Sequence, residues 1–230
     1  MNKSITTVRP NILAWLPWIL TATVSCIAIG VWGHSFGWQA KSINAYQFFP
    51  VLGLLGFSIM WSHYMAGEMK RTFLTDDIAN YFQITGYIVL LAILLHPGIL
   101  IYKRFRDGYG IPPSSYETYV APSMAWITLL GSVSLMIFLA YELKRFFGHK
   151  SWWIYLAAAG DLAMMAIFYH GLRLGSQLQG GWFRSVRIFY GITLVLAIGH
   201  KYIAMYLDMK TSPSSDLRSL RIPNDEKNPK

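Results

Sequence analysis

Six long apolar runs constrain the fold of this chain of 230 residues more than any other feature. They cover roughly residues 12–33, 47–65, 81–102, 121–141, 152–174 and 188–207. Each run holds close to the ~20 residues with which an α-helix crosses a hydrocarbon layer about 30 Å thick. The sequence therefore predicts an all-α, polytopic membrane protein, folded as a bundle of six transmembrane helices in a lipid bilayer.

The composition supports this class, because 54% of the residues are hydrophobic and only 13% are charged. The formal net charge of +9 would suit nucleic-acid binding, but Lys and Arg fall in short loops and in the tail, where membrane topology explains them. We therefore expect no nucleic-acid partner. The single cysteine, Cys26, excludes an internal disulfide bond and a metal site made of cysteines alone.

The basic residues also predict the orientation. With a cytoplasmic N-terminus, thirteen of the 20 Lys and Arg residues lie on the cytoplasmic side and the other seven on the outer side. This split favours a multi-pass protein of the cell membrane with both termini in the cytoplasm. Residues 1–208 then form the transmembrane domain, and the polar residues 209–230 form a disordered cytoplasmic tail.

Two histidines inside the apolar runs are the main functional signal, because a polar ring in a bilayer is costly unless it serves a function. His96 lies about 15 residues, or some 22 Å, into the third run, and His170 about 18 residues, or some 27 Å, into the fifth. These runs cross the membrane in the same direction, so both rings are expected in its outer half at similar depth. Two facing imidazoles are the axial ligands of a low-spin b-type haem, and the alternative is that each ring bonds a neighbouring helix.

Basic residues on the same side are candidates to bind the haem propionates. Arg173 follows His170 by three residues and Lys103 follows His96 by seven, so each shares its histidine's helix face. The alternative for both is snorkelling to the membrane interface. Four further arginines are less closely tied to the histidines: Arg104, Arg106, Arg184 and Arg187.

Gly86 lies ten residues before His96 in the third predicted helix, and His170 lies in the fifth of six helices. This pattern resembles the ferric reductase-like transmembrane domain. That superfamily includes ferric reductases, NADPH oxidases and a bacterial haem-binding membrane subunit that supplies electrons to periplasmic methionine sulfoxide reductase. The resemblance covers about residues 47 to 207. It implies electron transfer through haem b.

The inner half of this chain departs from the two-haem members of the superfamily, in which helices three and five each carry a second histidine. The matching positions, 14 residues before His96 and 13 or 14 before His170, hold Phe82, Ala157 and Leu156. The resemblance therefore implies one haem, held by His96 and His170.

Three other polar residues in the spans have open interpretations. His63 and His200 lie toward the inner side and could hold a second haem, bind a quinone or cap a neighbouring helix. Asp161, deep in the fifth run, could relay protons or form a hydrogen bond between helices.

We expect the electrons to come from a separate donor, because the sequence contains no GxGxxG motif for a nicotinamide cofactor. A cytosolic reductase, a membrane quinol and a bound flavin are the alternatives. We expect the membrane component of an oxidoreductase, with no catalytic residue of its own, that passes electrons to an acceptor at the outer face. The alternative function is a haem-free helical scaffold or small-molecule carrier that keeps the same fold.

Overall fold

The structure is a computed structural model, and it describes residues 12–39, 41, 43–73, 78–142 and 152–211. The described chain is helical, with no strand. Six long helices are present: α1 (Ile12–His34), α2 (Ala45–Phe73), α3 (Ala79–Arg106), α5 (Ala125–Glu142), α7 (Trp153–Leu174) and α8 (Gly181–Thr211). Short helical turns lie between them: α4 (Ser114–Glu117), η2 (Pro122–Met124) and η3 (Ser176–Leu178).

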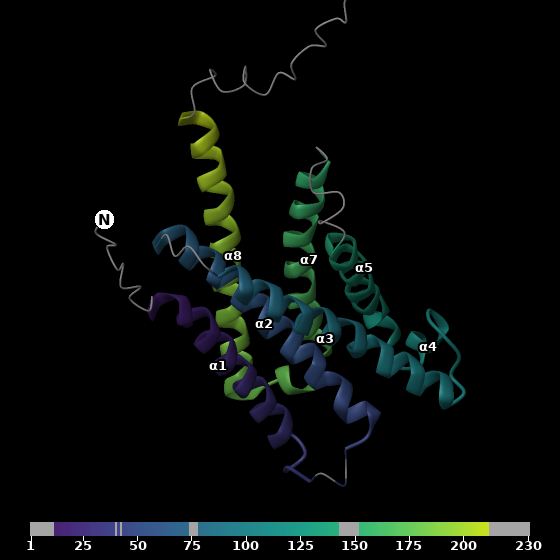
Figure 1. Cartoon of the computed structure of the whole chain (residues 1–230). Coiled ribbons are helices and arrows are strands. Elements are labelled where there is room, and N and C mark those ends of the chain that lie inside the picture. The colour runs from purple at the N-terminus through teal and green to yellow at the C-terminus, as the bar shows by residue number, and fades with distance from the viewer. Residues whose placement is uncertain (1–11, 40, 42, 74–77, 143–151, 212–230) are drawn as a thin grey trace, which may run out of the picture.

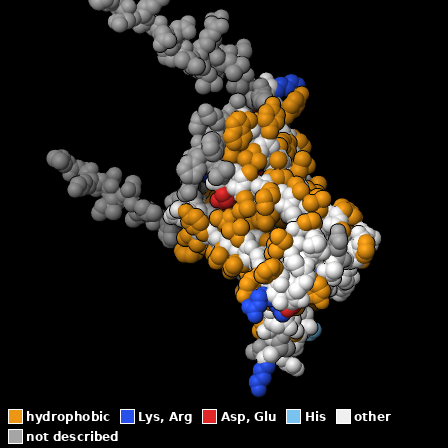
Figure 2. Space-filling model, turned by 90° about the vertical axis from the view of Figure 1, so that its right-hand side faces the viewer, with side chains coloured by type: hydrophobic (Ala, Val, Ile, Leu, Met, Phe, Trp, Pro, Cys, Tyr) orange, Lys and Arg blue, Asp and Glu red, His pale blue; other side chains and the backbone are white. Residues whose placement is uncertain are grey.

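The six long helices are each long and apolar enough to cross a membrane, which confirms the predicted all-α bundle. A helix suits this environment because it satisfies its backbone hydrogen bonds within one segment. Hydrophobic side chains cover much of the face in Figure 2, and Lys and Arg lie toward its two ends. Leu91, Leu129, Leu162 and Leu196 are among the exposed apolar residues that a lipid environment would cover.

Two helices, α2 and α8, extend furthest beyond the apolar runs predicted for them. α2 continues beyond Met65 to Phe73, because Glu68, Lys70 and Arg71 are good helix formers that extend the helix into the polar region. α8 begins at Gly181, seven residues before the predicted start, and ends at Thr211. Residues 209–211 of the predicted tail are therefore helical, and its residues 212–230 lie outside the described part.

The helices pack as two antiparallel pairs, α2 with α3 and α5 with α7, while α1 lies along α2 and α8 contacts α2 and α7. Figure 1 shows that successive spans alternate in direction, so α3 and α7 run the same way. This arrangement places the C-terminal ends of α3 and α7 on the same side of the bundle.

The main core is formed by α1, α2, α3, α7 and α8. Its buried residues include Val24, Phe57, Val89, Met164 and Leu194. Hydroxyl groups add polar contacts between helices in the bundle interior. Three of them, from α1, α2 and α3, bond one another at 2.7–2.8 Å: Thr21, Ser62 and Tyr81. Such interhelical hydrogen bonds fix the helices where apolar packing alone discriminates poorly.

Candidate functional site

His96 lies against the backbone of α2. Its Nδ1 is 2.8 Å from the carbonyl oxygen of Phe49. The ring covers Gly53, where an added Cβ would stand only 2.8 Å from the ring's Cε1 atom. Glycine is therefore required at this position for the ring to reach the carbonyl oxygen.

His170 repeats this arrangement on α5. Its Nδ1 is 2.8 Å from the carbonyl oxygen of Ile127, and a Cβ at Gly131 would stand 2.6 Å from its Cε1. In both pairs the glycine follows the accepting residue by four positions. The two antiparallel helix pairs thus present one histidine each by the same construction.

The hydrogen bonds determine which nitrogen of each ring is free. A carbonyl oxygen only accepts, so Nδ1 of each histidine carries the proton and donates it. Nε2 then keeps its lone pair, and no hydrogen bond of the described residues involves Nε2 of His96 or His170.

This geometry confirms that each ring bonds a neighbouring helix. It is also compatible with the prediction that both rings bind haem iron. An Nδ1–H donated to a backbone carbonyl is the usual support for a histidine that binds metal through Nε2. Among the described residues, no group of three or more His, Cys, Asp or Glu could hold a metal ion. The prediction that two imidazoles hold an iron whose remaining ligands come from a macrocycle stays a prediction.

Arg187 is the basic residue most closely associated with this region. Its side chain is buried in the first turns of α8, with the residue only 2% exposed. The guanidinium carbon lies 3.4 Å from the centre of the Phe57 ring, and Nη2 would be 3.3 Å from a Cβ added at Gly171. The atoms Nε and Nη1 have no hydrogen-bond partner among the residues that the structure describes.

The two basic residues favoured by sequence have other surroundings. Lys103 pairs with Asp107 at 2.5 Å, and Tyr46 donates to the same carboxylate at 2.6 Å. The bonds from Lys103 and Tyr46 hold the pKa of Asp107 below its usual range, so this contact is intact at neutral pH and is lost as the pH falls through that lowered pKa. Arg173 is exposed at the end of α7.

The other outer arginines are bonded to the protein or lie on an aromatic ring. Nη1 of Arg184 donates to the carbonyl oxygens of Leu178 and Gln179, each at 3.2 Å. Arg104 is buried against the Tyr109 ring and donates to Thr118, while Arg106 lies over the Tyr102 ring.

The inner histidines are not brought together. Nε2 of His63 bonds the Thr85 hydroxyl at 2.6 Å, and its ring packs edge-on against Phe82. Because Thr85 donates its own proton to the Tyr81 carbonyl, His63 must donate through Nε2, which leaves no lone pair there for a metal.

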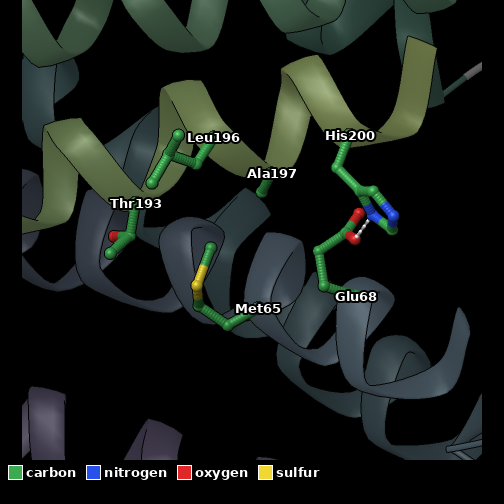
Figure 3. Close-up of a pocket in the computed structure, with 6 residues that line it drawn as sticks. All are labelled: Met65, Glu68, Thr193, Leu196, Ala197 and His200. Atoms are coloured by element: carbon green, nitrogen blue, oxygen red, sulfur yellow. Dashed lines mark hydrogen bonds and ion pairs between the residues drawn. The ribbon is translucent and has the colours of Figure 1, made fainter. Parts of the chain in front are cut away.

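His200 instead lies on the surface between α2 and α8, with its side chain 54% exposed, and its Nδ1 bonds Glu68. Figure 3 shows this pair at one end of a shallow groove of about 290 Å³. The groove is lined by Met65, Glu68, Thr193, Leu196, Ala197 and His200, and His63 is not among these residues.

Asp161 is buried in α7, but it is paired. Its carboxylate accepts hydrogen bonds from Tyr64 at 2.9 Å, Lys201 at 2.7 Å and Tyr202 at 2.8 Å. The predicted helix–helix hydrogen bond is therefore confirmed. Sequence reasoning missed all three donors, because they come from α2 and α8 and lie at least 40 positions away along the chain.

No protein-family model, curated protein or solved structure matched the chain in the comparisons. The resemblance to the ferric reductase-like domain therefore rests on the positions of Gly86, His96 and His170 in a six-helix chain, and it stays a prediction.

Proposed function

We propose that this membrane protein is an electron-transfer subunit that holds one b-type haem between His96 and His170 and serves an electron acceptor at the outer face. The observation that carries the proposal is the repeated histidine geometry, in which two separate helix pairs each leave one Nε2 lone pair free. A bound haem would supply a one-electron iron couple.

The protein's own groups hold and adjust the two ligands. Each backbone carbonyl fixes the ring orientation and the tautomer, and the donated Nδ1–H makes the imidazole a stronger ligand. Gly53 and Gly131 allow the rings to lie directly on the neighbouring helices. α2 and α5 therefore position the ligands, while α3 and α7 carry them.

The inner half supports a count of one haem. Phe82 lies where the two-haem members would have an inner histidine, and His63 packs against it with Nε2 already committed to Thr85. Electrons would then reach the haem from a cytosolic reductase or a membrane quinol at the inner face, with both termini in the cytoplasm and the bundle in the cell membrane.

Histidine substitution tests the ligand assignment. His96→Ala and His170→Ala are each expected to abolish the low-spin haem spectrum, because loss of one axial imidazole leaves the iron with an open position. His63→Ala is the matched control, since that ring is half-buried in the same bundle but bonds Thr85, and it should keep most of the spectrum. Loss of the spectrum in His63→Ala with retention in His96→Ala would overturn the assignment.

A further inference from the structure

Arg187 is a buried charge for which the described part of the protein supplies no counter-charge. No hydrogen bond or ion pair of the described residues involves its guanidinium, and Nε and Nη1 are fully covered. The Phe57 ring faces the cation at 3.4 Å, which offsets some of the lost hydration, but a ring face leaves the N–H donors unsatisfied. An uncompensated buried charge is strongly unfavourable, so an anion is expected here.

The carboxylates that form ion pairs among the described residues are paired with other cations. Asp161 accepts from Lys201, Asp107 from Lys103, and Glu68 pairs with Arg71 and His200. Snorkelling does not explain Arg187 either, because a snorkelling side chain ends in water and this one is buried at 2% exposure. The missing partner is therefore an anionic group that is not among these side chains.

The position of Arg187 links it to both candidate ligands. Phe57 follows Gly53, the residue under the His96 ring, by four positions on α2, which is about one helical turn. Gly171 directly follows His170 on α7, and its lack of a side chain leaves room for Nη2. The guanidinium thus contacts α2 one helical turn after Gly53 and contacts α7 at the residue that follows His170.

We propose that Arg187 binds a carboxylate, and that this carboxylate is a propionate of the haem held by His96 and His170. This inference rests on the proposed function. A haem brings its own carboxylates into the bundle when it binds, so it can supply a counter-charge at a place that is closed to bulk solvent. Arginine suits the task because its planar group donates several N–H bonds to a carboxylate.

The test removes the charge from the ligand and from the protein in turn. Apoprotein in detergent is titrated with haem b and with haem b dimethyl ester, whose propionates carry no charge. The unmodified protein should bind haem b roughly tenfold tighter or more, as expected for a charged hydrogen bond. Arg187→Gln should remove this preference, and Arg187→Lys should retain part of it. Arg71→Gln, at an exposed arginine that pairs with Glu68, should leave it unchanged.

The outcomes separate this inference from the proposed function. If the unmodified protein gives a low-spin spectrum with both porphyrins at equal affinity, Arg187 does not bind a propionate, although the haem assignment stands. The same conclusion follows if Arg187→Gln keeps the preference. If neither porphyrin gives a low-spin spectrum in the unmodified protein, the proposed function itself is wrong. The comparison of porphyrins in the unmodified protein needs no variant, so it decides the matter even if Arg187→Gln does not fold.

Discussion

Gly53 and Gly131 determine where the two histidine rings can lie. Each ring reaches a carbonyl oxygen that already belongs to a helix, and this approach is open only because the residue four positions later has no side chain. The sequence identifies His96 and His170 from their depth in apolar runs. It does not identify their carbonyl partners, since these depend on how α2 packs on α3 and α5 on α7.

Adding a methyl group at either glycine is expected to displace the histidine above it. In Gly53→Ala and Gly131→Ala the new Cβ would stand 2.8 Å and 2.6 Å from the ring, so the ring must move and the Nδ1 hydrogen bond is strained or lost. We expect weaker haem retention, measured by haem content after gel filtration. Gly98→Ala is the control, because nothing lies within 4 Å of its Cβ position, and equal haem loss in all three variants would contradict the account.

At the scale of helices, Asp161 ties α7 to α2 and α8. The carboxylate is 5% exposed and accepts three hydrogen bonds from these two helices. The sequence shows a carboxylate in an apolar run, but its donors can be recognised only once the helices are packed. The start of α8 is also predicted incorrectly from the sequence. Arg184 and Arg187 interrupt the apolar pattern, so the predicted start is too late, although both residues lie within the helix.

Asp161→Ala should destabilise the bundle, because it leaves the Lys201 ammonium and two tyrosine hydroxyls without their acceptor. The expected cost is roughly 1–3 kcal/mol, measured by thermal unfolding in detergent. Leu162→Ala is a neighbouring control, since that side chain is exposed on the outside of the bundle. Equal stability of the two variants would show that the carboxylate does not hold the helices together.

Asp161→Asn tests the proton-relay interpretation separately, because an amide accepts hydrogen bonds but does not titrate.

For the whole molecule, sequence predicts the fold better than it predicts the site. Length and apolar character are enough to identify six spans, because a bilayer imposes them on each helix separately. The counter-charge of Asp161, the separation of His63 from His200 and the burial of Arg187 all depend on contacts between distant helices. These contacts cannot be derived from one segment at a time.

The even number of spans and the distribution of Lys and Arg predict that both termini face the cytoplasm. A reporter that is active only in the cytoplasm, fused after Lys230, should therefore be active. The same reporter inserted after Gly108, between α3 and α4, should be inactive because that turn lies on the opposite side. The reverse pattern would invert the inner and outer assignments used above.

The most direct measurement of the central claim is the haem content of the purified chain, together with its reduced-minus-oxidised spectrum. The account predicts about one b-type haem per chain with the low-spin spectrum of an iron bound by two imidazoles. Folded protein without haem would contradict the electron-transfer proposal and favour a haem-free scaffold or carrier. Two haems per chain would contradict the assignment to the His96 and His170 pair alone.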